Sequence, residues 1–308
     1  MKEILVIGAT SPLGVRLVDH LTERGNKVLA TYRLAERIPV HWEQHPAVNT
    51  VRLDLSEPAA FRDICTDCVI WLVHIDQGRF NKDEARVNIE PLLRFLREAR
   101  SQGLEKIVFV SSGGSVYGEA RHLPITEDHS RAPLSSYGIA KKAMEDALIE
   151  FREDSETRTA IIRPGNIYGF DSPCEKGIVG AFLGSILRQT PFTLIDEGRT
   201  IRDFIHVDDV CHAIDCAIMS DRPDIIWNAG TGLGTSVSDL LGLISAIGGF
   251  GMPPINNVEN YASDVKANIL NIDRIAVEAG WNPEIDLQSG IAKVIADWHR
   301  VDGSGAFT

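Results

Sequence analysis

The sequence predicts an α/β fold, a doubly wound parallel sheet of about seven strands with a smaller C-terminal lobe. Short apolar runs, typical of strands buried on both faces, alternate with helical patterns through residue 230. The first run, residues 4–7, enters a glycine-containing turn that opens directly into a helix. Strand, turn and helix in this order begin a βαβ unit, so we expect the strands to be parallel.

The expected elements follow in chain order. The strands are expected at 4–7, 27–31, 48–53, 68–74, 107–111, 159–162 and 225–228. The helices are expected at 15–24, 85–100, 137–152, 178–187, 210–219, 238–247 and 290–298. Each strand is a short apolar run, whereas each helix repeats apolar residues at steps of three and four.

The composition is typical of a soluble globular protein, with 44% apolar and 24% charged residues among 308. Forty-three acidic and 31 basic residues give a net charge of −12, which argues against nucleic acids and anionic membranes as partners. The chain shows no signal-peptide pattern and no apolar run of spanning length, so we expect a cytoplasmic protein.

Five cysteines are spread along the chain, at positions 65, 68, 174, 211 and 216. An odd number without a secretion signal predicts reduced thiols. Cys65 and Cys68 have the spacing of half a zinc site. No second pair or histidine cluster at ligand spacing accompanies them, so we expect no metal.

The turn after the first strand is the first candidate ligand site. It lies between a buried strand and a helix, with a second strand following within about 30 residues, as in dinucleotide-binding βαβ units. A helix N-terminus placed this way binds a pyrophosphate through its dipole and free N–H groups. Ser11 replaces the middle glycine of the motif, and its hydroxyl could donate to phosphate. The candidate cofactor residues here are Gly8, Thr10, Ser11, Pro12, Leu13 and Gly14.

The end of the second strand distinguishes the two nicotinamide dinucleotides. An acidic residue there would accept from the ribose 2′-hydroxyl of NAD, whereas an Arg would bind the 2′-phosphate of NADP. Arg33 follows this strand, Arg37 is near, and no acidic residue lies between the strand and Glu36, so NADP is favoured over NAD. After the third strand, Asp54 and Leu55 are candidate contacts of the adenine end.

Tyr137 and Lys141 form the candidate reaction centre. Residues four apart on a helix share one face, so both side chains can reach the same ligand. A Tyr phenol has an ordinary pKa of about 10, and a nearby ammonium together with an oxidised nicotinamide ring favours the phenolate. Tyr137 can therefore serve as a general acid or base.

These motifs resemble those of the extended short-chain dehydrogenases/reductases, specifically the nucleotide-sugar epimerase/dehydratase group. The resemblance covers nearly the whole chain. It rests on the turn at 8–14, Asn88, the stretches 111–118, 163–169 and 202–209, the Tyr137 and Lys141 pair, and residues 228–230 and 280–283. It implies a Rossmann-like dinucleotide-binding domain at 1–168 and 201–230, with a substrate-binding lobe at 169–200 and 231–308.

The resemblance also implies roles for single residues. Tyr137 would be the acid/base on a sugar hydroxyl or keto group, and Lys141 would bind the nicotinamide ribose and tune the phenol. Pro164 would contact the cofactor. Asn166 and Arg202 occupy positions that contact a substrate diphosphate.

Three departures from the family pattern bear on the reaction. The usual position of the catalytic hydroxyl is Gly113, so Ser112 or Ser115 must supply it. In an extended segment Ser115 would point to the same side as Gly113. Dehydratases of this group carry an Asp-Glu pair where Gly114 and Ser115 stand, which argues against dehydration. Tyr261 stands where a second phosphate-binding Arg is common.

The expected function is epimerisation of a nucleotide sugar at C4 through a keto intermediate. The resemblance implies a homodimer that pairs through the helices at 85–100 and 137–152. One alternative is NADPH-dependent reduction of a keto sugar or another small carbonyl compound, which Arg33 favours. The other alternative is a cofactor-binding regulator that has lost catalysis.

Overall fold

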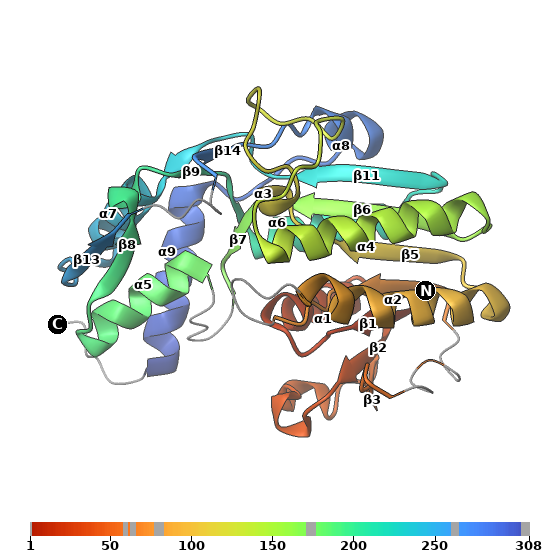
Figure 1. Cartoon of the computed structure of the whole chain (residues 1–308). Coiled ribbons are helices and arrows are strands. Elements are labelled where there is room, and N and C mark those ends of the chain that lie inside the picture. The colour runs from red at the N-terminus through yellow and green to blue at the C-terminus, as the bar shows by residue number, and fades with distance from the viewer. Residues whose placement is uncertain are drawn as a thin grey trace.

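A parallel sheet of seven strands dominates the structure (Figure 1). The structure is a computed structural model that describes residues 2–57, 61, 66–76, 83–170, 177–259 and 265–302. Cys65, Cys174 and Tyr261 lie outside these residues.

The strand order is β3-β2-β1-β4-β5-β6-β11, and every neighbouring pair is parallel. The strands are β1 (Glu3–Ile7), β2 (Lys27–Tyr32), β3 (Val48–Arg52), β4 (Cys68–Trp71), β5 (Lys106–Val110), β6 (Arg158–Pro164) and β11 (Asp224–Ala229). The predicted doubly wound sheet of about seven strands is confirmed. The order of the strands reverses between β1 and β4, which places a ligand crevice at their carboxyl ends.

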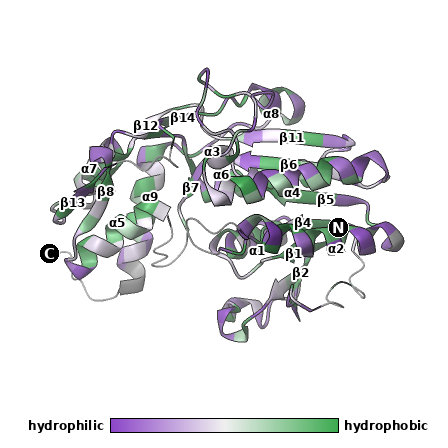
Figure 2. Ribbon diagram, viewed as in Figure 1, coloured by the Kyte–Doolittle hydropathy of each residue, from purple (hydrophilic) through white to green (hydrophobic). Residues whose placement is uncertain are grey.

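Two pairs of helices cover the two faces of this sheet. They are α1 (Pro12–Glu23) with α6 (Val207–Met219), and α2 (Glu84–Gln102) with α4 (Ser136–Glu153). Residues of β1 alternate between the two cores, so that Ile4 and Val6 pack with α1 whereas Leu5 packs with α2. Apolar residues gather on the strands and on the helix faces turned toward them (Figure 2). All four helices lie within a few residues of their predicted positions.

A separate hydrophobic core lies at the left in Figure 1. It is built from α5 (Gly177–Arg188), α7 (Val237–Gly248), α9 (Leu287–Asp302) and the parallel pair β8 (Phe192–Ile195) and β13 (Ile255–Val258). The three helices were expected, whereas the two strands were not. α8 (Asp273–Ala279) packs instead against β11. The division of the chain at residues 168, 200 and 230 stays a prediction.

Short strands connect the two cores. They are β7 (Asn166–Tyr168) paired with β10 (Phe204–His206), and β9 (Ile201–Arg202) between β12 (Thr235–Ser236) and β14 (Ala267–Asn268). Between β9 and β10, the buried Asp203 carboxylate accepts hydrogen bonds from the N–H groups of Thr231 and Leu270. Pairs of two or three residues leave no periodicity, so the sequence did not predict these strands.

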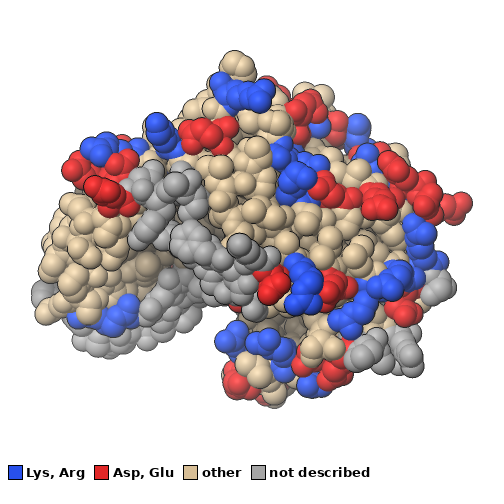
Figure 3. All heavy atoms as spheres, in the orientation of Figure 1, with Lys and Arg blue, Asp and Glu red and all other residues tan. Residues whose placement is uncertain are grey.

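Charged side chains of both signs are interspersed over the described residues of the face in Figure 3. This part of the surface therefore presents no extended area of a single sign. Among the described residues, no helix combines the length and the apolar character needed to cross a bilayer.

Candidate active site

A cleft of about 1470 Å³ runs past the carboxyl ends of β1 to β4. Its volume and its place at the reversal of strand order suit a dinucleotide. The candidate residues that line it are Gly8, Thr10, Ser11, Pro12, Arg33, Asp54, Leu55 and Tyr137. The structure thus brings the candidates after three different strands into one cavity with the candidate reaction centre.

The turn between β1 and α1 is shaped for a close ligand. Gly8 has a φ of +91°, and a Cβ there would come within 2.9 Å of Cγ2 of Val73. Its N–H donates to Oγ1 of Thr31 over 3.0 Å, which joins the turn to β2. A Cβ on Gly14 would lie 2.4 Å from the Gly8 carbonyl oxygen, so only glycine lets α1 approach β1 this closely. The N-terminus of α1, at Pro12, consequently borders the cleft.

Ser11 caps α1 from within the turn. Its hydroxyl donates to the Gly8 carbonyl over 2.8 Å and accepts from the Gly14 N–H over 3.1 Å. In this structure the hydroxyl hydrogen is therefore engaged by the Gly8 carbonyl, and donation to a phosphate stays a prediction. Leu13 packs against the hydrophobic core beside α1, so Leu13 and Gly14 shape the turn.

Basic residues border the opposite end of the cleft. Arg33 and Arg37 both line it, and both are exposed. Hydrogen bonds from the Ser56 N–H and hydroxyl hold the pKa of the Asp54 carboxyl below its ordinary value, and the charge of Arg33 contributes to this lowering. Leu55 completes this end of the cleft.

Tyr137 lies in the first turn of α4, which is capped by Ser135. A side-chain hydrogen bond joins Ser112 to Tyr137. Burial raises the pKa of Tyr137 to about 12, the bond from Ser112 lowers it, and the charge of Glu84 raises it. The Lys141 Nζ lies 5.8 Å from the centroid of the Tyr137 ring and donates to the Val110 carbonyl over 2.8 Å. Burial lowers the pKa of Lys141 to about 7.

The candidate hydroxyls Ser112 and Ser115 differ in their setting. Residues Gly113–Val116 form the short helix α3, so the alternation of an extended segment, on which the direction of Ser115 was predicted, is wrong here. A Cβ on Gly113 would lie 2.7 Å from Cδ1 of Leu270, which leaves room only for glycine. Of the two serines, Ser112 is the one for which a bond to Tyr137 is observed.

Gly114 leaves space on the other side of Ser112. A Cβ at this position would lie 3.3 Å from Oδ1 of Asn166 and 3.9 Å from Oγ of Ser112. Asn166 also lines a smaller cavity, which shares Gly177 with the dinucleotide cleft. Position 114 thus borders both Ser112 and Asn166 and carries no acidic side chain.

Two further candidates lie at strand ends. Pro164 ends β6, where it is in register with Ala229 of β11. Arg202 is 8% exposed, and its Nη1 donates to the Ile201 carbonyl over 2.8 Å. The chain itself therefore binds part of the guanidinium that was expected to contact a diphosphate.

Comparison with known proteins agrees with this geometry. A family model described as "NAD dependent epimerase/dehydratase family" matches residues 4–230. The chain belongs to this family. A putative UDP-glucose 4-epimerase of Methanocaldococcus jannaschii is 31% identical over 306 residues, covering 96% of this chain and 98% of that protein. The chain is thus an enzyme of the extended short-chain dehydrogenase/reductase type, as its motifs implied.

Solved structures of epimerases share the fold. A UDP-glucose 4-epimerase of Thermotoga maritima with UDP-glucose superposes with a TM-score of 0.86 at 27% identity, over 97% of this chain and 99% of that chain. A UDP-glucose 4-epimerase of Thermus thermophilus in complex with NAD gives 0.84 at 26% identity, over 96% and 98%. The family is NAD-dependent, and these comparisons lend no support to a preference for NADP.

The cleft fits the family's cofactor. The glycine turn and the α1 N-terminus are placed for a pyrophosphate, whereas Asp54, Leu55 and Arg33 border the far end. When bound, the dinucleotide supplies the hydride chemistry of such a site. Tyr137 lines the same cleft.

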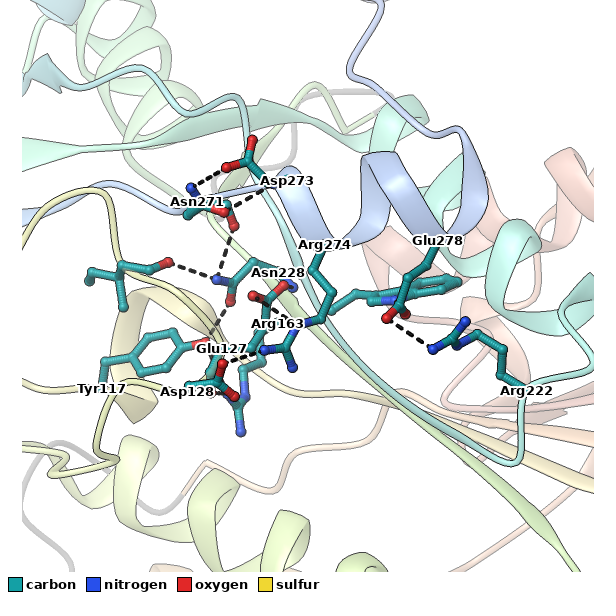
Figure 4. A network of polar contacts seen from close by, with 12 residues as sticks. Tyr117, Glu127, Asp128, Arg163, Arg222, Asn228, Asn271, Asp273, Arg274 and Glu278 are labelled. Atoms are coloured by element: carbon teal, nitrogen blue, oxygen red, sulfur yellow. Dashed lines mark hydrogen bonds and ion pairs between the residues drawn. The ribbon is translucent and has the colours of Figure 1, made fainter.

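Buried polar residues hold this epimerase/dehydratase site together (Figure 4). Arg163 donates to the Tyr117 hydroxyl over 2.9 Å, and the Tyr117 hydroxyl donates to Oδ1 of Asn228 over 2.6 Å. The Asn228 N–H donates in turn to the Glu127 carboxylate over 2.8 Å. On its other side, Arg163 donates to both oxygens of the Glu145 carboxylate over 3.0 and 2.7 Å. Strands β6 and β11 are thereby tied to α4 and to the loop before it.

Sequence reasoning missed several of these residues. Glu145 stood out only as a polar residue between apolar positions of α4, and Glu127 belonged to no motif. His74 is the last residue of the strand expected at 68–74 and was assigned no role, yet it lies against Tyr137. A signal was present, since a charged or titratable residue among fully apolar neighbours requires a partner when it is buried.

Proposed function

We propose that the protein epimerises a nucleotide sugar at C4 through a keto intermediate. The observation that carries the proposal is the convergence of Ser112 and Lys141 on Tyr137, which lines the dinucleotide cleft. The neighbouring position is Gly114, so the acidic residue that dehydration would use is missing there. The relatives named as UDP-glucose 4-epimerases support the same substrate class.

Each residue of this centre has its own part in the reaction. Tyr137 would take up the proton of the C4 hydroxyl and return it, while a dinucleotide bound in the cleft would supply the hydride acceptor and donor. Ser112 donates to the same oxygen and holds it near the phenol. Lys141, whose Nζ lies 5.8 Å from the centroid of the Tyr137 ring, would favour the phenolate through its charge and bind the nicotinamide ribose. Asn166 and Arg202 contact the diphosphate.

The direct test is to incubate the purified protein with UDP-glucose or UDP-galactose and catalytic amounts of dinucleotide. We expect each sugar to give the same equilibrium mixture by proton NMR, with no net oxidation or reduction at 340 nm, because the hydride is returned. Failure of any 4-hydroxy nucleotide sugar to interconvert on the cofactor-loaded protein would reject the epimerase proposal.

The alternative function is NADPH-dependent reduction of a keto sugar, and Arg33 and Arg37 favour it because both line the adenosine end of the cleft. In this alternative Tyr137 acts only as a proton donor. Stoichiometric consumption of NADPH with formation of an alcohol would identify this activity. Turnover without net consumption of the dinucleotide would contradict it.

We also propose that Arg33 binds a 2′-phosphate. Arg33→Asp should lower the ratio of NADP to NAD affinity by about 10- to 100-fold, since one charge-assisted hydrogen bond contributes about 1.5–3 kcal/mol. Calorimetric titration of both dinucleotides measures the ratio. Arg97→Asp, which makes the same charge change at an exposed position of α2, is the matched control. An unchanged ratio in Arg33→Asp would show that Arg33 does not contact the phosphate.

Pairing of two copies through α2 and α4 stays a prediction. Leu93 on α2 is 39% exposed and Ile139 on α4 is 49% exposed, which supports it. The molecular mass in solution, measured by light scattering, tests it.

A further inference from the structure

His74 follows β4 and packs against the candidate acid/base. The centroids of the His74 and Tyr137 rings are 4.5 Å apart, and their planes meet at 72°, an edge-to-face contact. His74 lines the cleft together with Tyr137. The His74 ring therefore lies against one side of the phenol. A side-chain hydrogen bond joins this phenol to Ser112.

Glu84 fixes the orientation of this imidazole. The Nε2 of His74 lies 2.7 Å from Oε1 of Glu84, and the exposed fractions of the two side chains are 13% and 3%. Among the residues that the structure describes, no group hydrogen bonds to the buried Nδ1. Glu84 therefore selects the tautomer in which Nε2–H donates to its carboxylate.

The backbone beside His74 is pinned to α2 as well. The Asn88 side chain accepts from the Ile75 N–H over 2.7 Å and donates to the Ile75 carbonyl over 2.9 Å. Asn88 lies one turn after Glu84, and it also donates to the Glu84 carbonyl over 2.8 Å. Two residues of α2 thus hold the segment that presents His74 to Tyr137.

Charges from three segments act on this contact. Burial lowers the pKa of His74 below its ordinary value, the charge of Lys141 on α4 lowers it further, and Glu84 on α2 and Asp76 oppose this. The lowered pKa favours the neutral form of the imidazole. The charge of Glu84 raises the pKa of Tyr137, whereas the hydrogen bond from Ser112 lowers it.

We propose that His74 and Glu84 form a positioning pair for Tyr137, in which the imidazole holds the phenol toward Ser112 and the carboxylate places a negative charge beside it. The inference rests on the proposed acid/base role of Tyr137. His74 and Glu84 are positioning residues, since they act on the substrate only through Tyr137.

The charge is tested by Glu84→Gln, which keeps an acceptor for the His74 N–H and removes only the charge. Oxidised dinucleotide carries a positive nicotinamide, so its affinity rises with pH as the Tyr137 phenol ionises. We expect this rise to move about one pH unit lower in Glu84→Gln, because a like charge close to an ionising group raises its pKa by about one unit or more. Calorimetric titration of NAD or NADP over a pH series measures it.

Two variants make this binding experiment specific. Tyr137→Phe should lose the rise with pH, which assigns the rise to the phenol. Glu90→Gln, an exposed position on the same helix, should leave the curve in place. Superimposable curves for Glu84→Gln and the unmodified protein would overturn the charge effect.

The ring contact is tested by His74→Gln, which keeps an N–H donor for Glu84 and removes the imidazole. A misplaced acid/base costs between about 10- and 100-fold in kcat. We expect this loss with little change in KM or in dinucleotide affinity. A wild-type kcat in His74→Gln would show that the ring does not position Tyr137.

If no nucleotide sugar is turned over, the proposed function fails. The binding curves of Glu84→Gln still test whether the His74 and Glu84 pair acts on Tyr137.

Discussion

Tyr137→Phe is expected to reduce turnover of the nucleotide sugar by between about 10² and 10⁴-fold, the range attributed to a general acid/base. The substitution removes the phenol oxygen and leaves a ring of the same shape against His74. Ser112 and Lys141 remain, yet neither can take the substrate proton in its place. Lys141 is held away by its bond to the Val110 carbonyl.

The measurement is kcat from the product formed by the variant and the unmodified protein. The control is the bound dinucleotide, which should stay stoichiometric, because the residues around the pyrophosphate and adenosine ends of the cleft are untouched. Wild-type turnover in the variant would reject the epimerase and the reductase proposals together. It would leave the silent, cofactor-binding regulator as the remaining hypothesis.

Glu145→Ala is expected to destabilise the fold by about 3–5 kcal/mol, the cost of leaving a buried charge unpaired. The Glu145 side chain is fully buried and pairs with Arg163, which is 2% exposed. It also accepts from Ser111 and from Arg131. Because a domain is stable by only about 5–15 kcal/mol, this loss is a large part of the total.

Urea denaturation followed by tryptophan fluorescence measures the change. Glu150→Ala provides the matched control, since Glu150 is exposed on the same helix α4 and should change stability by no more than about 0.5 kcal/mol. Equal midpoints for Glu145→Ala and Glu150→Ala would contradict the view that the Arg163 pair holds β6 against α4.

The sheet and the main site could be predicted because their determinants are local. Apolar runs define the strands, and steps of three and four define the helices. Lys141 shares a helix face with Tyr137 by spacing alone. The carboxyl ends of parallel strands lie at one edge, so Gly8, Arg33 and Asp54 were expected near one another, and they line one cleft.

Side-chain partners could not be predicted in the same way. Ser112, and not Ser115, forms the hydrogen bond to Tyr137. This choice depends on α3, in which Gly113 packs against Leu270, a residue far along the chain. The bond of the Ser11 hydroxyl to the Gly8 carbonyl could not be predicted either, because the motif says nothing about it.

By itself the sequence determined the sheet of seven parallel strands, the dinucleotide turn and the Tyr137 and Lys141 pair. These depend on period and spacing within one or two neighbouring elements. Only the tertiary structure decided that His74 and Glu84 meet Tyr137 and that Glu145 pairs with Arg163. Each of these contacts joins residues of different elements, and a buried charge finds its partner only when those elements pack together.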